Sequence, residues 1–362
     1  MINSLDEARK EINRIDAEMA KLFEERMGAA KIIAEYKKER GLPILDEQRE
    51  REIIKKNSLL ISDEEHKEYY VSFLKGIMAT SRAYQARIIS GARVAFSGTE
   101  GAFAHIAAKK LFKNAEMVAY RDFKSAYKAV EEGECDICVL PIENSYNGEV
   151  GQVTDLMFSG SLFVNDVMEL AVDQALLCVP GTKLEDIKTV VSHPQAIGQC
   201  AEYIRKKGFA AKEFSNTALA AKYVAEQGDK SMCAIASSDA AEIFGLEVLE
   251  RNINEARSNT TRFAVFGRAE ATRDPKIFGT HSIILFTVRN EAGALAKAID
   301  VIGSHGFNMR TLRSRPMKEL LWEYYFYVEA EGNVKSEEGK KMCHELSKFC
   351  DKLKFVGSYV KY

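Results

Sequence analysis

The chain has 362 residues, more than one hydrophobic core usually supports, so two or three domains are expected. Hydrophobic residues make up 46% and charged residues 29%, which excludes a mostly disordered protein. The 51 lysines and arginines nearly balance 53 aspartates and glutamates. This balance excludes the excess of positive charge with which proteins bind nucleic acid or an anionic membrane.

The N-terminus is charged and lacks the apolar core of a secretory signal, and no run of 18 uncharged apolar residues occurs. These features predict a cytoplasmic protein without a membrane partner. Seven cysteines, an odd number, lie mostly in apolar runs, which indicates reduced core thiols. Cys135 and Cys138 form a lone CxxC in an apparent strand, so we expect no metal site and no cofactor.

Residues 1–90 predict an all-helical domain. Apolar residues recur at alternating three- and four-residue steps between residues 5 and 39, which is typical of a long helix with a coiled-coil-like seam. Gly41 and Pro43 should end this helix. Further helices are expected over residues 46–60 and 62–89, the last with Ser62 and Glu65 in the register of a capping box.

Arg26 occupies a seam position, where an unpaired charge costs several kcal/mol, so an anionic partner is expected. Lys37 follows about three turns later on the same face, roughly 16 Å along the axis, and both cations can converge on one small dianion. A solvated charged face with one buried salt bridge is the alternative. Polar residues at helical spacing on the other two helices can point inward as sets: Asp46, Arg49, Glu50, Ser81 and Gln85.

Residues 92–267 alternate short apolar runs with helical stretches, which predicts an α/β domain with largely parallel sheets. Four of these runs end in small polar residues where a helix should begin, at SGTEGAF, ENSYNGE, SHPQA and SSDAAE. Such junctions present free backbone N–H groups that bind carboxylates. A single hydroxyl there is ordinarily an N-cap, but four together predict a ligand cleft.

A polar linker over residues 268–280 should lead to a tail whose pattern is strand, helix, strand, strand, helix, strand. This pattern is typical of a βαββαβ split unit. The sequence therefore predicts a multidomain chain with an all-α domain at 1–90, an α/β core at 92–267 and an α+β tail at 281–362.

The helical domain resembles the all-helical class of chorismate mutase over its full length. The resemblance implies a pericyclic rearrangement of chorismate to prephenate, which needs a compact conformer and stabilised charge. Arg26, Arg49 and a second subunit's Arg9 would hold carboxylates, while Lys37 and Gln85 would stabilise charge on the breaking ether oxygen. The family's active-site pattern falls on Arg9, Arg26, Lys37, Asp46, Arg49, Glu50, Ser81 and Gln85.

Subunit composition follows from helix geometry. Arg9 and Arg26 lie about 26 Å apart along one continuous helix, too far to share one small ligand. Arg9 is therefore expected to come from another chain, in a homodimer or a dimer of dimers with composite sites.

The α/β core resembles the prephenate dehydratase family through PIENSYNGEVGQVTDLM, SHPQAIGQC, ASSDAAEIFGLEVL and NTTRFAVF, in the family's order. The resemblance implies a two-lobed, periplasmic-binding-protein-like core that converts prephenate to phenylpyruvate. Thr261 would assist departure of the ring hydroxyl by donating a hydrogen bond, and His193 is the alternative acid. Residues implied to bind substrate are Glu143, Asn144, Ser145, Ser192, His193, Gln195, Thr260, Arg262 and Phe263.

One position departs from this family. Where relatives have a hydroxyl after GAF or GAY, this chain has Ala104, and Thr99 and Ser97 are the expected substitutes.

The tail resembles the ACT amino-acid-binding domain, with Gly293, Ala294 and Leu295 opening its first helix and Asn308 starting its second strand. Phenylalanine is the implied effector, bound between subunits. A purely structural dimerisation domain is the alternative.

The family's ESRP motif is RSRP here, at residues 313–316. Arg313 adds positive charge beside Arg310 and Arg315, which would repel a ligand's ammonium group unless Arg313 points to solvent. We therefore expect a weaker phenylalanine response than in ESRP relatives, strengthened by Arg313→Glu.

Two further functions stay open. The dehydratase substrate is either prephenate or arogenate, because the two differ only by an amino group. A non-catalytic dicarboxylate or amino-acid sensor would share the pockets at helix starts, but not the set Arg26, Lys37, Arg49 and Gln85 in one domain.

Overall fold

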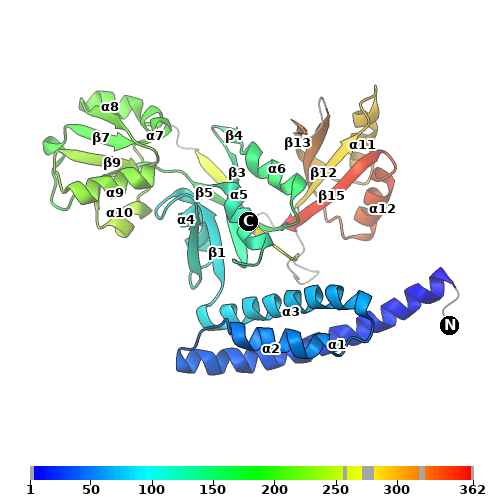
Figure 1. The fold of residues 1–362 in the computed structure, drawn as a ribbon. Coiled ribbons are helices and arrows are strands. Elements are labelled where there is room, and N and C mark those ends of the chain that lie inside the picture. The colour runs from blue at the N-terminus through cyan, green and yellow to red at the C-terminus, as the bar shows by residue number, and fades with distance from the viewer. Residues whose placement is uncertain (1–3, 256–258, 271–280, 318–322, 360–362) are drawn as a thin grey trace. The chain divides into compact units, whose positions relative to one another are not determined.

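The computed structural model describes residues 4–255, 259–270, 281–317 and 323–359 (Figure 1). The chain forms two compact units. One comprises residues 1–93 and 114–116, and the other comprises residues 94–113 and 117–362. None of the described helices has the length and hydropathy needed to span a membrane.

The first unit is built on three helices, α1 (Leu5–Arg40), α2 (Glu47–Ser58) and α3 (Glu64–Ser90). Gly41 ends α1 in the left-handed conformation, with φ of 62°, which confirms the predicted stop. The capping box predicted at Ser62 is wrong. Asp63 is the N-cap of α3, because its carboxylate accepts the free N–H of Glu65 at the helix start.

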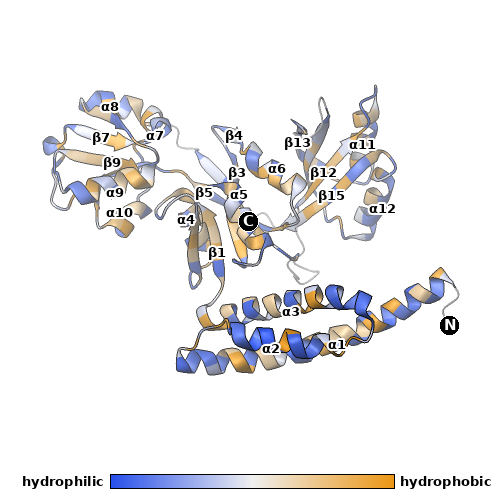
Figure 2. Ribbon diagram, viewed as in Figure 1, coloured by the Kyte–Doolittle hydropathy of each residue, from blue (hydrophilic) through white to orange (hydrophobic). Residues whose placement is uncertain are grey.

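The seam of α1 is only partly covered within the unit. Ala30 and Ala34 are buried where α1 packs on α3, against the side of α3 that buries Leu74 and Met78. Apolar residues nevertheless continue along α1 toward its N-terminal end (Figure 2). The apolar side chains there are between 41% and 67% exposed: Leu5, Ile12, Ile15, Met19 and Leu22. An exposed apolar stripe of this length is typical of an interaction surface.

The second unit begins with an α/β lobe around a six-stranded sheet. The strand order is β2-β1-β3-β11-β5, with the short β4 paired to β3. Its strands are β1 (Arg93–Ser97), β2 (Glu116–Tyr120), β3 (Ile137–Asn144), β4 (Gly148–Glu149), β5 (Phe163–Ala171) and β11 (Thr260–Gly267). Its helices are α4 (Phe103–Leu111), α5 (Phe123–Glu131) and α6 (Gly151–Ser159).

A second α/β lobe is formed by a five-stranded sheet in the order β10-β6-β9-β7-β8. Its strands are β6 (Ala175–Cys178), β7 (Thr189–Ser192), β8 (Ala210–Glu213), β9 (Met232–Ala236) and β10 (Glu247–Glu250). Its helices are η1 (Leu184–Asp186), α7 (Pro194–Gln199), α8 (Ala201–Lys207), α9 (Thr217–Gln227) and α10 (Asp239–Phe244).

Both sheets are mixed, so the prediction of largely parallel sheets is wrong. The β1–β3, β7–β8 and β7–β9 pairs are parallel. Strands β5, β6, β10 and β11 instead pair antiparallel. The reason is topological. The chain passes from β5 into β6 of the second lobe and comes back from β10 into β11, so the strands beside these crossings do not follow the strand-helix-strand repeat.

The tail has the predicted βαββαβ order, in an antiparallel sheet of order β13-β14-β12-β15. Helices α11 and α12 pack on one face. The other face packs into the first lobe, where Tyr325 and Tyr327 share a core with Leu140 and Phe266. The elements are β12 (His281–Val288), α11 (Ala294–Ser304), β13 (Asn308–Pro316), β14 (Tyr324–Glu331), α12 (Glu337–Leu346) and β15 (Cys350–Tyr359).

The predicted linker lies mostly outside the described residues, which lack 271–280. All seven cysteines are described and free, five of them buried, which confirms the prediction of reduced thiols. Burial raises the pKa of Cys200 to about 12, so this thiol stays protonated at neutral pH.

Gly357 allows β15 to approach the backbone of β5. A Cβ at this position, where φ is 157°, would collide with the backbone of Val164. We expect Gly357→Ala to destabilise the unit by about 1–3 kcal/mol, as overpacked positions do, and to lower the melting temperature. Differential scanning calorimetry measures this. Gly303→Ala in α11 is the control, because nothing lies within 4 Å of its new methyl group and it should not lower the melting temperature. Equal melting temperatures for Gly357→Ala and the unmodified protein would contradict the close approach.

Candidate functional site

In the helical unit, Arg26 is a half-buried cation without a carboxylate partner among the described residues. Its guanidinium donates to Ser81 Oγ and, at 3.5 Å, to the Ile77 carbonyl. Burial lowers the pKa of Arg26, although an arginine with a lowered pKa is still charged at neutral pH. Its expected anionic partner is therefore not supplied by the described part of this chain.

Gln85 lies one helical turn beyond Ser81 on the buried face of α3. Only 8% of Gln85 is exposed, and its Oε1 is buried without a hydrogen-bond partner among the described residues. A buried amide oxygen without a donor is costly, and a ligand hydroxyl or a water would relieve that cost.

The other residues predicted in this domain make local contacts. Lys37 Nζ donates to the Ile44 carbonyl at 2.5 Å, and Asp46 caps α2 by accepting from the Arg49 N–H at 2.9 Å. Glu50 pairs with Arg82 of α3. The Arg49 side chain is largely exposed and lies 3.7 Å from Glu52. Arg9 is 68% exposed on the uncovered half of α1, and its described partner is Asp6 at 3.9 Å.

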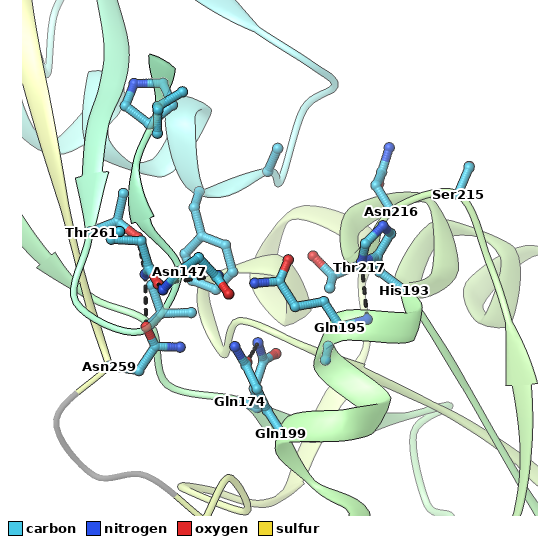
Figure 3. Close-up of a pocket in the computed structure, with 18 of the residues that line it drawn as sticks. Asn147, Gln174, His193, Gln195, Gln199, Ser215, Asn216, Thr217, Asn259 and Thr261 are labelled. Atoms are coloured by element: carbon cyan, nitrogen blue, oxygen red, sulfur yellow. Dashed lines mark hydrogen bonds between the residues drawn. The ribbon is translucent and has the colours of Figure 1, made fainter. Parts of the chain in front are cut away.

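The second unit has a cleft of about 410 Å³ lined by both lobes (Figure 3). The first lobe contributes the β3–β4 hairpin, the start of α4 and the start of β11. The second lobe contributes α7 and the start of α9. Polar residues line it throughout: Asn144, Asn147, Gln174, His193, Gln195, Gln199, Ser215, Asn216, Thr217, Asn259, Thr261 and Glu149, although the Glu149 carboxylate pairs with Arg315 of the tail.

Asn144 organises the first wall of this cleft. Its Oδ1 accepts from the backbone N–H groups of Tyr146 and Asn147 at 3.0 and 2.9 Å, which fixes the orientation of the amide. Its Nδ2 therefore points the other way and donates to Thr261 Oγ1 at 2.9 Å and to Asn259 Oδ1 at 2.7 Å. Because Thr261 Oγ1 accepts from Asn144, its own hydroxyl hydrogen is free to be donated to a ligand.

The second wall is formed by residues at helix starts and by a pair of glutamines. His193 is the N-cap of α7, and its Nδ1 accepts from the Gln195 N–H at 3.2 Å. This contact requires an unprotonated Nδ1, so a neutral ring would carry its hydrogen on Nε2. Gln174 donates to Gln199 Oε1 at 3.3 Å, and Gln174 Oε1 is buried without a partner among the described residues.

Four of the residues predicted in the core line the cleft: Asn144, His193, Gln195 and Thr261. The fourth predicted junction, SSDAAE, contributes nothing to the lining. Of the remaining predicted residues, Ser192 is fully buried and donates to the Ile235 carbonyl at 2.5 Å, and Phe263 is buried in the core. Ser145 Oγ accepts from the Thr260 N–H at 2.9 Å, which ties the hairpin to β11.

Glu143 and Arg262 also lie outside the cleft lining, because successive strand residues point to opposite faces. Arg262 Nη1 lies 3.0 Å from Glu143, and Arg262 Nη2 lies 2.7 Å from Glu329 of the tail. Burial alone would lower the pKa of Arg262, but the hydrogen bonds with Glu329 outweigh it and raise that pKa well above its usual range.

Several residues that line the cleft were missed in the sequence. The junction at Ser215–Thr217 starts α9 in the same way as the predicted junctions, but it follows β8, whose four residues are all exposed, so no apolar run marks it. Asn259 precedes Thr260 in the NTTRF motif, which was the available signal. Gln199 lies in the SHPQAIGQC motif, which was the available signal for it, whereas Gln174 lies in no motif that would have identified it.

Neither expected substitute for the hydroxyl missing at Ala104 lines the cleft. Ala104 is itself buried, and the lining residues here are Ala102 and Phe103. Thr99 Oγ1 is buried without a partner among the described residues.

Two family models match the chain. The model for chorismate mutase type II matches residues 8–86, and the model for prephenate dehydratase matches residues 94–271. A bifunctional chorismate mutase/prephenate dehydratase from Aquifex aeolicus is 33% identical, with 99% of each chain covered.

Solved structures resemble the second unit. A quorum-quenching acylase is 31% identical with a TM-score of 0.69, covering 75% of this chain and 98% of its own. The prephenate dehydratase from Arthrobacter aurescens, solved in complex with L-Phe, is 25% identical with a TM-score of 0.67, covering 74% of this chain and 90% of its own.

Proposed function

This chain belongs to the family of bifunctional chorismate mutase/prephenate dehydratases, and on that premise we propose how named residues carry its two reactions. The enzyme rearranges chorismate to prephenate and converts prephenate to phenylpyruvate, in phenylalanine biosynthesis. We assign the first reaction to residues 1–90, the second to residues 92–267 and regulation to residues 281–362.

For the mutase reaction, the unpaired charge of Arg26 is the observation that carries the assignment. Chorismate is a dicarboxylate, and Arg26 with Arg49 would hold its carboxylates. Lys37 and Gln85 would stabilise charge at the ether oxygen, with Gln85 doing so in its present orientation only through a bridging water, since its unpaired Oε1 is an acceptor. Rotation of the amide would instead present Nε2 as the donor.

The mutase site is completed by a second subunit in this proposal. The uncovered apolar stripe of α1 bears Arg9, which lies too far along the helix to meet Arg26 of its own chain. Pairing two copies along this stripe buries the apolar side chains and brings Arg9 to the partner's site.

For the dehydratase reaction, the hydrogen bond from Asn144 to Thr261 carries the assignment. Loss of CO2 sends the electron pair of the breaking C–C bond into the ring, the C–O bond breaks, and the departing hydroxide takes a proton to leave as water. Thr261 donates to that oxygen as it leaves, and Asn144 stabilises the charge that builds on Thr261 Oγ1. His193 is the second candidate donor, through Nε2–H.

Phenylalanine is the proposed effector of the tail, in line with the L-Phe complex of the Arthrobacter relative. The charge argument for a weak response no longer holds, because each arginine concerned has a carboxylate partner. Arg313 pairs with Glu143, Arg315 with Asp155 and Arg310 with Glu331. Gly293, with φ of 85°, begins α11 together with Ala294 and Leu295, and Asn308 is held by Glu331 at 2.8 Å.

Asn144→Asp should inactivate the dehydratase while keeping the hairpin turn. The new carboxylate still accepts from the backbone of Tyr146 and Asn147, but it cannot donate to Thr261, whose hydroxyl then turns toward it. We expect kcat for prephenate to fall by about a hundredfold, the effect of removing one charge-stabilising donor. A rate within threefold of the unmodified enzyme would show that Asn144 does not set the direction of the Thr261 hydroxyl.

The two reactions should be separable. The unmodified protein should form phenylpyruvate from chorismate, because only both activities in series give that product. Thr261→Ala should abolish dehydration and leave chorismate consumption near normal, with Thr261→Ser as the control that keeps the hydroxyl. Arg26→Ala should do the reverse. Parallel assays with chorismate, prephenate and arogenate measure this, and equal loss of both activities in a folded variant would refute the division.

Composite mutase sites should show complementation. Refolding Arg9→Ala and Arg26→Ala chains together should restore roughly a quarter of the mutase activity, since half of the dimers are mixed and each mixed dimer has one intact site. Each variant refolded alone is the control. A mixture as inactive as its components, but dimeric by sedimentation, would rule out the shared site.

A further inference from the structure

The tail contacts the back of the hairpin that lines the dehydratase cleft. Strand β13 lies beside α6 (Figure 1), and its arginines reach acidic residues of α6 and β4. We propose that Arg313 is a positioning residue for the dehydratase reaction, which neutralises the acid pair Glu143 and Glu149 and so holds the β3–β4 hairpin that presents Asn144 to Thr261. This inference rests on the function proposed above.

The hairpin places two like charges opposite each other. Glu143 pairs with Glu149 and Asn144 pairs with Gly148 in the antiparallel register of β3 and β4. Like charges directly opposite each other on neighbouring strands are destabilising. Both carboxylates are mostly removed from water, with side-chain exposures of 25% and 17%, so solvent screens their repulsion poorly.

Among the described cations, Arg313 is the one that contacts both acids. Its Nη2 donates to Glu143 Oε1, and its Nε lies 3.8 Å from Glu149 Oε2. Arg262 contacts only Glu143 of the pair, and Arg315 contacts only Glu149, at 2.8 Å. The charged groups of all elements that face the pair are Arg262 of β11, Arg313 and Arg315 of β13, Asp155 of α6 and Glu329 of β14.

A glycine directly after the hairpin allows the tail to approach closely. A Cβ at Gly151, which begins α6 directly after the hairpin, would collide with the Arg315 guanidinium. Arg315 also pairs with Asp155 at 2.9 Å, and Asp155 accepts from the Tyr325 hydroxyl at 2.7 Å. Together with the core shared by the tail sheet and the first lobe, these contacts fix β13 relative to the hairpin.

The two faces of the hairpin are therefore coupled. Asn144 and Glu143 are neighbours on β3, one directed to the cleft and the other to the tail. Removing the Arg313 charge takes away the one described cation that contacts both acids and leaves each with a single arginine, Arg262 or Arg315. The repulsion between the acids then rises and shifts the hairpin, and the Asn144 amide with it. A catalytic group displaced by about 1 Å loses up to a hundredfold in rate.

The test is the dehydratase rate on prephenate without phenylalanine. Arg313→Ala should lower kcat by about ten- to a hundredfold. Arg313→Lys, which keeps one charge, should retain most of the rate. Arg310→Ala is the matched control, since Arg310 lies on the same strand but pairs with Glu331 within the tail, and its kcat should stay within about twofold of the unmodified enzyme.

A double variant separates positioning from a general loss of stability. In a Glu149→Gln background, removing Arg313 should have a much smaller effect on kcat than in the unmodified protein.

Failure of the Arg313 proposal can be distinguished from failure of the proposed function. An unmodified protein that does not turn over prephenate would refute that function. An active unmodified enzyme whose Arg313→Ala variant keeps a full kcat at pH 8, or loses no more than Arg310→Ala, would overturn the positioning role. So would a defect that is equally large in the Glu149→Gln background. Differential scanning calorimetry of the same samples reports whether the second unit is folded.

Discussion

The dehydratase half of the molecule depends on the alternation of side chains along β11. This strand lies between β3 and β5 in the first sheet, so its position is set by hydrogen bonds on both edges. Thr261 lines the cleft and its neighbour Arg262 reaches Glu329 in the tail. The residue proposed to act in catalysis and the residue that contacts the tail are therefore neighbours on one strand. A slip of β11 by one residue would turn both side chains to the wrong face of the sheet.

Side chains also alternate between the two faces of the sheet along β3, and this connects the cleft with the tail a second time. Asn144 directs its amide to Thr261, while Glu143 joins Arg262 and Arg313 behind it. Hydrogen bonding to Arg262 lowers the pKa of the buried Glu329 despite its burial, so this carboxylate stays charged at neutral pH. A charged, partly buried network of this kind tolerates few arrangements, which suits it to hold a catalytic hairpin.

In the helical unit, by contrast, the polar groups of the proposed site lack partners among the described residues. Arg26 has no carboxylate and Gln85 Oε1 has no donor among the described residues. Both cost stability in the free protein, and in the proposed function both would be satisfied by an anionic ligand with a bridging hydroxyl or water.

Much of the fold was predictable because periodicity reports which side chains are buried. The long helix, its end at Gly41 and the βαββαβ order all followed from spacing. The antiparallel return strands did not, because an apolar run has the same pattern in either direction. Motifs located Thr261 and Asn144, but Glu143 and Arg262 belong to the same motifs and face the tail, a distinction that needs the partner surface. Asn216 was missed because β8 before it is exposed.

The core shared by the tail and the first lobe has a consequence for removal of the tail. Tyr325 stacks on Phe158 with ring centroids 4.2 Å apart, and Tyr359 is buried in the same core. Cutting the chain before β12 would expose the apolar side of the first lobe to water and leave Glu143 facing solvent without Arg313. The tail therefore serves the first lobe as a structural cover, apart from any part that it has in the proposed regulation.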